Sequence, residues 1–402
     1  MELYVFDREL NLIGIIDAFT SLQWNRRYLK CGDFELQCDL TRNNLNLLAK
    51  GNIIWKQGDT EAGYINYRNL KQDTEGKEVL DVKGNFLTGY LKQRIVWGII
   101  NMNDTVENIM RALVNQNCIN PADSSRIIPN LILGDLKSLT FSTSYIQDKY
   151  ANLNDEIEAL STLSNLGHRV NFDVVNKKLI FEVYAGIDRS VNQTDRSPCI
   201  FSKEFENVLE QEYTDSNDNL KNVELVNGTY TPDSSGDSTA VPVNQSVTIG
   251  NTSGLDRYET FLDSGDISAS GKDENGNDIT ISEQDALNML TDKGNTDIVQ
   301  YQEVQTFDSK INVNSNLVYK QDFDLGDIVT CTSKKWGITL DARITEIGEV
   351  YEEQGPQVNI TFGNNVPTLI DKIKQKSQPK SSTTTIVSVS APDISVVDGG
   401  SF

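Results

Sequence analysis

GDFELQCDL, residues 32–40, alternates apolar and polar residues, so that Phe34, Leu36, Cys38 and Leu40 share one face of an extended chain. A period of two predicts a strand with that face buried. No helical period interrupts the first 90 residues, and the hairpins predicted there favour an antiparallel sandwich or small barrel.

Two hairpins are predicted on either side of this strand. The first joins apolar runs at 3–6 and 12–16 around the polar turn Asp7-Arg8-Glu9. The second runs from 64 to 82 and turns at 73–77.

The hydrophobic period changes after this first β portion. Apolar residues then recur at spacings of three and four: Val106, Ile109, Met110, Leu113 and Val114. This spacing predicts an amphipathic helix, with Asp104 and Glu107 as an acidic capping box at its start. A second helix is predicted over 152–166, with Gly167 as the residue that ends it. A hairpin over 170–184 completes a small α+β unit.

From residue 202 the pattern returns to strands. Four glutamates make their start unusually acidic: Glu204, Glu206, Glu210 and Glu212. The stretch 227–254 is rich in Ser, Thr, Asp, Asn and Gly, so we expect an exposed loop or ribbon that is too polar to bury a core. Strands resume over 304–362, where Val358, Ile360 and Phe362 alternate with polar residues.

A third helix is predicted within this second β portion, over 282–293. Ser282 with Asp285 caps its start, and Gly294 is expected to end it. Beyond about residue 376 the chain has no core-forming pattern. Low charge and many β-branched residues there predict a tail that becomes a strand only against a partner.

Composition limits the functions that the chain can have. Its 402 residues are 38% apolar, and 36 basic against 58 acidic residues give a net charge of −22. This charge argues against a nucleic-acid grip and against docking on an anionic membrane. The longest strongly apolar run, 95–100, is far shorter than the roughly 20 residues of a membrane-spanning helix, and no secretory signal is visible.

Few residues point to catalysis or metal binding. Five scattered cysteines, expected to be buried or incidental thiols, include no Cys-x-x-Cys pair: Cys31, Cys38, Cys118, Cys199 and Cys331. A pairing of Cys31 with Cys38 stays open. The single histidine, His168, follows a predicted helix end, where we expect a structural role in place of nucleophilic catalysis. We predict no catalytic, cofactor-binding or metal-binding residue.

One glycine-rich stretch is similar to a phosphate-binding loop. Five residues separate Gly265 from Gly271-Lys272, where that loop has four, and Asp273 follows where the loop needs Ser or Thr. We therefore expect no phosphate site. Carboxylate pairs for glycoside cleavage stay open, because 58 acidic residues bring such pairs together by chance.

The same region has part of the spacing of a calcium loop, in Asp273, Asn275 and Asn277. The glycine of such a loop is two positions early, at Gly276, and Gln284 takes the place of the final glutamate. We expect a flexible turn.

Seven short stretches, taken in order, carry a family resemblance. They are GDFEL at 32–36, RIVWG at 94–98, RIIPNLILG at 126–134, YAGIDRS at 184–190, FSKEFEN at 201–207, GLDRYE at 254–259 and DLGDIV at 324–329, the last followed by Gly363. Over about 4–374 the chain resembles the tail-hub proteins of long-tailed bacteriophages, and more narrowly the Gp37-like minor tail structural family of siphophages.

Several residues of these stretches have structural interpretations. Gly326-Asp327 suits a tight turn in which the aspartate accepts from backbone amides. Asp188-Arg189 and Asp256-Arg257 are either ion-paired corners or solvated turns. Trp97 and Trp336 are interpreted as core or subunit-interface anchors.

The resemblance implies a homotrimeric hub at the tail tip or baseplate of a virion, assembled in the host cytoplasm. Each subunit of such a hub contributes two tail-tube-like antiparallel β-barrel domains, so three subunits present a pseudo-sixfold ring. The ring would join the tail tube or distal tail protein to threefold tip components. Implied partners are these proteins, tail fibre or tip proteins and the tape measure protein. DNA would meet the chain only in transit, and no enzyme activity, cofactor or membrane binding by this chain is expected.

The expected fold class is mainly β with an α+β insertion and a small helical insertion. The expected boundaries are 1–97 for the first tube-like β-barrel domain, 98–198 for the α+β insertion domain, 199–262 with 300–375 for the second tube-like β-barrel domain, 263–299 for the helical insertion and 376–402 for a flexible tail.

Two other functions stay open, namely a tail-associated cell-wall-degrading enzyme and a host receptor-binding module. The enzyme is disfavoured because the 26 residues after the hub region are too few for a catalytic domain. The negative charge fits a channel that repels DNA, which predicts lumen residues that are acidic or neutral and polar. It fits equally a charge that keeps the free subunit soluble.

Overall fold

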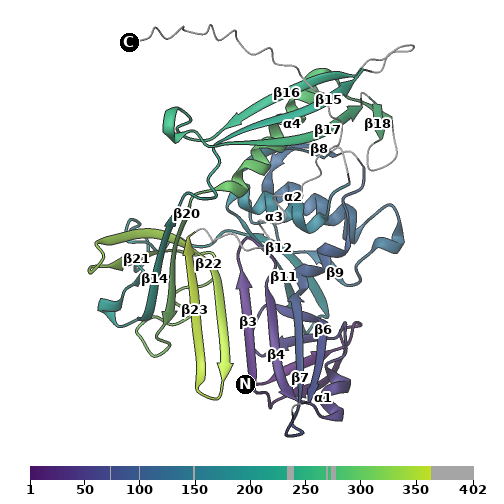
Figure 1. The fold of residues 1–402 in the computed structure, drawn as a ribbon. Helices are drawn as coiled ribbons and strands as arrows, with labels where there is room; N and C mark the ends of the chain where they lie inside the picture. Colours follow the sequence, from purple (N-terminus) through teal and green to yellow (C-terminus); the bar gives the residue numbers. More distant parts are fainter. Residues whose placement is uncertain are drawn as a thin grey trace, which may run out of the picture. The chain divides into compact units, whose positions relative to one another are not determined.

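The computed structural model describes residues 1–363 apart from 73, 99, 148–149, 233–239, 269 and 273–277. The expected mainly β fold is confirmed, because strands far outnumber helices and form several sheets (Figure 1). The prediction of two β-barrels is not confirmed: among the described strands, none of the sheets closes on itself. The predicted tail at 376–402 lies outside the described residues.

The largest sheet has thirteen strands from two distant parts of the chain. The N-terminal strands are β1 (Leu3–Phe6), β2 (Leu12–Ile16), β3 (Ser21–Arg27), β4 (Asp33–Asp39), β5 (Ile53–Lys56), β6 (Ala62–Gln72) and β7 (Glu78–Phe86). The C-terminal strands are β13 (Ile200–Phe201), β14 (Val208–Ser216), β20 (Val304–Ile311), β21 (Ile328–Ser333), β22 (Ile338–Glu352) and β23 (Gly355–Gly363).

The same strand order occurs twice within this sheet. Side by side, an N-terminal half runs β6-β7-β4-β3 and a C-terminal half runs β22-β23-β20-β14. If the four strands of each half are numbered along the chain, both halves have the order third, fourth, second, first across the sheet. The halves meet where β3 pairs antiparallel with β22. The two portions predicted as separate barrels therefore share one sheet.

The predicted N-terminal hairpins are confirmed, since β1 pairs with β2 and β6 with β7. Strand β4 buries Phe34, Leu36 and Cys38 on one face, as the alternation predicts. The sequence pattern missed α1 (Arg42–Leu47) and the 3-10 helix η1 (Leu87–Gln93). Helices of one or two turns contain too few residues to display a hydrophobic period.

The helices and the hairpin expected for the α+β unit are present, and they lie along the chain between the two halves. Its elements are β8 (Ile100–Thr105), α2 (Val106–Val114), the π-helix η2 (Asn115–Ile119), η3 (Ser124–Arg126), β9 (Leu131–Leu133), β10 (Ser142–Gln147), α3 (Leu153–Ser164), β11 (Gly167–Asp173) and β12 (Lys178–Tyr184). The apolar faces of α2 and α3 pack with the β11–β12 hairpin into one buried cluster. Strand β9 was not predicted; it adds to β12 in parallel.

The predicted cap of α2 is wrong by one residue. Thr105, and not Asp104, accepts the amide of Asn108 at 3.3 Å. Glu107 is buried, and its carboxylate accepts the amides of Lys137 and Leu139 at 2.6 and 2.9 Å. A tertiary contact therefore takes the side chain that the sequence pattern assigned to the cap.

The residue that ends α3 also differs from the prediction. Asn165 adopts the left-handed conformation with φ of 56°, which an asparagine tolerates. Gly167 instead begins β11, where a Cβ atom would lie 2.3 Å from the ring of Tyr28. The glycine is needed for close packing.

A third unit lies within the C-terminal β portion. Its elements are β15 (Val223–Thr231), β16 (Val241–Thr248), η5 (Gly254–Asp256), β17 (Glu259–Ser268), β18 (Ser270–Lys272), β19 (Asp278–Thr280), α4 (Glu283–Ile298) and η6 (Val299–Tyr301). The expectation that 227–254 is too polar for a core is wrong, because β15 and β16 pair and bury Tyr230 and Val243 of this stretch. The capping box of Ser282 with Asp285 is confirmed.

The predicted end of this helix at Gly294 is wrong, since α4 continues to Ile298. A Cβ atom on Gly294 would lie 2.7 Å from Val226 and 2.8 Å from Val247. The glycine therefore lets the helix approach β15 and β16. No helix of the described residues has the length and apolar content to cross a membrane.

Candidate functional site

One face of the large sheet is polar across both halves. Because side chains alternate along a strand, the residues paired with one another by register fall on the same face. We call this surface the polar face; it includes Gln23, Asn25, Arg27, Asp33, Glu35, Gln37, Tyr67, Asn69, Lys71, Asp81, Lys83, Asn85, Glu210, Glu212, Thr214, Asp308, Lys310, Glu346, Gly348, Val350, Gln357, Asn359 and Thr361. The opposite face is the core, with Trp24, Leu36, Ile347 and Phe362 buried.

Arg27 joins the two halves on the polar face. Its guanidinium contacts Asp33 on β4, in the N-terminal half, and Glu346 on β22, in the C-terminal half, at 3.2 Å. Partial burial alone would lower the pKa of Arg27, but Glu346 and Asp33 outweigh it and raise the pKa. The charge of Arg27 is therefore neutralised by carboxylates of the sheet itself.

Two lysines of the polar face are also held by carboxylates. The ammonium of Lys83 lies 2.7 Å from Glu35, and that of Lys71 lies 2.5 Å from Asp81. Burial would raise the pKa of Asp81, but hydrogen bonds from Lys71 and Gln37 outweigh it and lower the pKa. With acidic residues in excess over basic ones, the face presents carboxylates and neutral amides.

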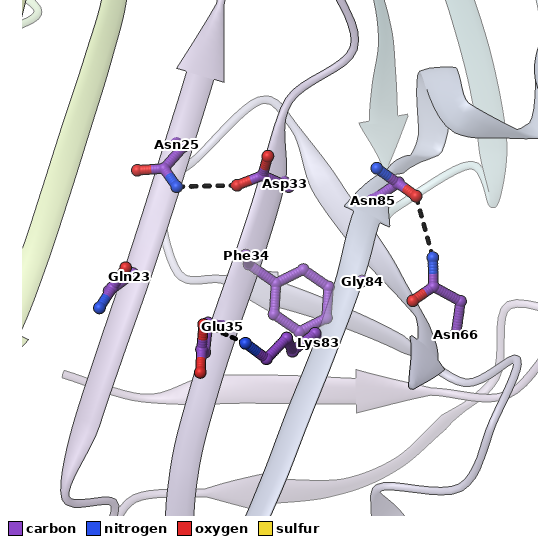
Figure 2. Close-up of a pocket in the computed structure, with 9 residues that line it drawn as sticks. All are labelled: Gln23, Asn25, Asp33, Phe34, Glu35, Asn66, Lys83, Gly84 and Asn85. Carbon is purple, nitrogen blue, oxygen red and sulfur yellow. Dashed lines mark hydrogen bonds and ion pairs between the residues drawn. The ribbon is translucent and has the colours of Figure 1, made fainter. Parts of the chain in front are cut away.

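A hollow of about 280 Å³ lies on this face. Figure 2 labels the residues that line it. Asn25 donates to Asp33 at 2.7 Å and Asn66 donates to Asn85 at 2.9 Å at its sides, while Phe34 and Gly84 form part of its wall. A second hollow of about 390 Å³ lies beside Thr105, Glu107 and Leu139. Neither lining contains histidine or cysteine.

Beneath the junction of the halves lies a network of buried charges that the sequence pattern did not reveal. Arg26 on β3 contacts Glu61 at 2.8 Å and Asp324 at 2.7 Å. Lys56 on β5 contacts Asp59 at 3.1 Å and also contacts Glu349 on β22. Both cations thus have one partner from each β portion of the chain.

Asp59 is the most enclosed carboxylate of this network, with its side chain fully buried. Burial would raise its pKa, but Lys56, Arg26 and Lys320 outweigh this effect and hold the pKa well below its usual range. Lys320 lies 3.2 Å from Asp59 and comes from the C-terminal portion. Such a network suits a fixed joint between the two portions.

His168 has a structural place, as expected. Its side chain is buried on β11, its Nδ1 atom lies 2.6 Å from the Ser161 hydroxyl, and burial lowers its pKa to about 4. All five cysteines are free and buried, so Cys31 and Cys38 are not paired. Burial raises the pKa of Cys31 to about 12, which leaves this thiol unreactive.

No group of three or more histidines, cysteines and carboxylates able to hold a metal ion occurs among the described residues. Gly265 lies in β17 and Lys272 ends β18. The residues of the weak calcium pattern, 273–277, lie outside the part of the chain that the structure describes, so the expected flexible turn there stays a prediction.

Asp327 accepts the amides of Ile187 and Asp324, as predicted for the Gly326-Asp327 turn. It also pairs with Arg189 at 2.8 Å. Arg257 pairs with Glu259 at 2.5 Å, and not with Asp256.

Trp97 and Trp336 are 41% and 43% exposed, so neither is a core residue in one chain. Arg126 lies over the ring of Trp97, with its guanidinium carbon 4.1 Å from the ring centre. Their predicted role as subunit-interface anchors stays a prediction.

The comparisons with known proteins agree with the expected family. Residues 2–364 match the family described as Siphovirus ReqiPepy6 Gp37-like protein. The chain therefore belongs to this family of siphovirus tail proteins and is a structural protein of a bacteriophage tail. No curated protein matches the chain.

Three of the similar solved structures are tail proteins. The 43 kDa tail protein of prophage MuSo2 from Shewanella oneidensis is 13% identical, with 90% of this chain and 98% of that chain covered and a TM-score of 0.50. Prophage tail protein gp18 from Listeria monocytogenes is 13% identical, with coverages of 94% and 98% and a TM-score of 0.48. A tail protein from Neisseria meningitidis is 12% identical, with coverages of 90% and 97% and a TM-score of 0.49.

Proposed function

We propose that this chain is the structural hub at the distal end of the phage tail, acting as a homotrimer and without enzyme activity. The observation that carries the proposal is the repeated strand order of the large sheet. Three copies would present six equivalent four-stranded halves to a sixfold tail tube or distal tail protein. The same three copies would present threefold symmetry to tip and fibre proteins.

The polar face is the surface that we assign to the DNA channel. It runs through both halves, and three of its four cations, Arg27, Lys71 and Lys83, are each held by a carboxylate. The fourth, Lys310, lies opposite Glu210 in the strand register. A wall with excess negative charge repels the DNA backbone and provides no counterion release that would make DNA stick. DNA would then pass without binding.

The remaining parts of the chain have proposed places around this wall. The portion 1–97 and the C-terminal strands of the large sheet would act as two tube-like domains, with 98–198 as one insertion. The expected bounds 199–262 and 263–299 are redrawn in this proposal, because β15, β16 and β17 form a sheet of their own with α4 and make 223–301 the second insertion. The stretch 376–402 is proposed to add a strand to a neighbouring tail component. Deleting it should leave the trimer intact and impair tail assembly.

The test of the hub is the solution mass of the purified chain together with images of particle ends. We expect a mass three times the 44.9 kDa of one chain, and antibody labelling at the distal tip of the tail. Labelling along the tail tube or at its head-proximal end would contradict the proposal.

A further inference from the structure

The junction inside one chain suggests how two copies join. The first strand of the N-terminal half, β3, pairs with the second part of β22, where Arg27 lies opposite Glu346 and Leu22 opposite Tyr351. The first part of β22 is occupied by β21, which pairs from Ile338 to Arg343. Along one edge, β22 thus pairs first with β21 and then with β3.

The two outer strands of the repeated halves, β6 and β14, are the counterparts of β22 and β3. On its outer edge, β6 pairs only through its first residues, Ala62 to Tyr64, which lie opposite β5. Among the described residues, no strand pairs with the outer edge of 66–72 or of β14. An open edge presents unpaired amides and carbonyls to another chain.

The registers of the two halves fix which residues correspond. A bulge precedes Tyr67 in β6 and Glu346 in β22. Tyr67 lies opposite Lys83 of β7, and Glu346 lies opposite Thr361 of β23. Strands β7 and β23 hold the same place in their halves. Tyr67 therefore corresponds to Glu346.

The outer strands correspond in the same way. Trp24 lies opposite Phe34, and Tyr213 lies opposite Phe307. Phe34 in turn lies opposite Gly84 of β7, and Phe307 lies opposite Phe362 of β23. Tyr213 therefore corresponds to Trp24, and β14 from Glu210 onward corresponds to the whole of β3.

Applying the internal register to β6 and β14 gives a defined set of opposite residues. Because Trp24 lies opposite Glu349, Tyr213 falls opposite Leu70 of another copy. The neighbouring positions then place Asp215 opposite Arg68 and Glu212 opposite Lys71. The alignment used only backbone register, yet it brings opposite charges together twice.

The unpaired chain also shows features that such a partner would relieve. Leu70 is 50% exposed, and Glu212 lies directly opposite Asp308 of its own chain, a like-charge pair. The Nε atom of Arg68 is buried without a hydrogen-bond partner among the described residues. Within the described part of the chain, Leu70 therefore lacks an apolar neighbour on the open edge, and Arg68 lacks a carboxylate.

We propose that β14 of one copy adds antiparallel to the outer edge of β6 of a second copy, with Tyr213 opposite Leu70 and Glu212 opposite Lys71. The contact joins two different surfaces, so it builds a ring if the rotation closes. The number of copies in that ring rests on the proposed function; the strand pairing does not.

A cysteine pair in the predicted register tests this contact. We expect Asn69→Cys with Thr214→Cys to form a disulfide between copies on mild oxidation, because directly opposite residues have Cα atoms within disulfide range. The five native cysteines are buried, which keeps the background low. The control, Asn69→Cys with Glu210→Cys, is out of register by four residues, roughly 13 Å, and should stay uncrosslinked.

A charge reversal gives an independent measurement in the full chain. We expect Glu212→Lys to weaken association about tenfold, summed over the copies of the contact, and Lys71→Glu with Asp81→Asn in the same chain to restore it. Asp81→Asn removes the carboxylate that Lys71 contacts within one chain. Glu206→Lys is the matched control, because Glu206 is exposed, lies outside β14 and gives the same change of charge. Mass photometry or sedimentation would measure the association.

The outcomes separate the contact from the hub. A covalent species of three chains with the in-register pair supports both proposals. A trimer without this crosslink overturns the contact and leaves the hub standing. A crosslinked species that does not close at three supports the contact and overturns the trimeric hub. A chain that stays monomeric at every concentration and forms no crosslink overturns the contact.

Discussion

Arg26 and Lys56 are long cationic side chains that are almost fully buried, at 1% and 4% exposure. Burying a charge is costly unless it is paired, and both are paired with carboxylates from the two β portions. Removing one partner leaves the other charge desolvated. At the scale of single residues, these ion pairs therefore fix which surfaces of the two portions can meet.

Replacing Glu61 with Gln should destabilise the chain by about 3 kcal/mol, because Arg26 then loses a buried charged partner. Urea unfolding followed by tryptophan fluorescence would measure this loss. Glu35→Gln is the control: the Glu35–Lys83 pair is exposed on the polar face, and its loss should cost less than about 1 kcal/mol. Equal losses for the two variants would contradict the assignment of the buried network.

His168 gives a pH dependence that belongs to one residue, since it is the single histidine of the chain. Its pKa is about 4 when folded and 6.5 in the reference state. The unfolded chain therefore binds the proton first, and stability is lost as the pH falls through this window. We expect His168 to contribute about 2 kcal/mol of lost stability between about pH 7 and pH 5.

The variant His168→Asn, which retains a hydrogen-bonding atom near Ser161, should lack this contribution. The measurement is the difference in pH dependence of unfolding between the two proteins, since carboxylates titrate alike in both. A wild-type imidazole that titrates near pH 6.5 by NMR would show the prediction to be wrong.

At the scale of elements, α4 shows how packing overrides a local signal. A glycine inside a helix costs about 1 kcal/mol relative to alanine, which is why Gly294 reads as a helix end. In the folded chain the helix continues, because Gly294 faces Val226 and Val247 on the adjacent strands. The contact of the helix with its sheet compensates for the weak propensity.

Gly294→Ala should therefore destabilise the protein by about 1–2 kcal/mol in spite of its better helix propensity, since β-branched valines cannot easily move aside. Asn295→Ala, at the exposed neighbouring position of the same helix, should stabilise by a few tenths of a kcal/mol. Thermal unfolding of both variants would measure the difference. A stabilising Gly294→Ala would show that α4 does not approach β15 and β16 this closely.

At the scale of the whole molecule, the charge of −22 is distributed so that the polar face has few free cations. A hub that lets DNA pass needs this distribution and not merely a negative total. The two explanations of the charge, channel repulsion and solubility, differ in where a reversal of charge should matter.

Replacing Glu35 and Glu210 with lysine should create DNA binding at low salt, because both positions lie on the polar face and become cationic. The wild-type chain should bind no DNA in the same gel-shift assay. Glu206→Lys with Glu353→Lys makes the same change of net charge at exposed positions off that face, and should not bind. Equal binding by both double variants would favour solubility as the explanation.

The sequence by itself determined the N-terminal hairpins, the existence of α2, α3 and α4 and the family, because hydrophobic period and short stretches such as GDFEL are local properties of the chain. It missed β9 and the pairing of β15 with β16, whose polar residues hide the alternation. It also left His168 as the single imidazole that a Ser-His or Cys-His site could use. Only the tertiary structure decided that β3 pairs with β22, that both β portions share one sheet with a repeated strand order, and that Arg26 and Lys56 are buried between them. The physical reason is that strand pairing and ion pairing join residues some 300 positions apart, and neither leaves a periodic trace in the sequence.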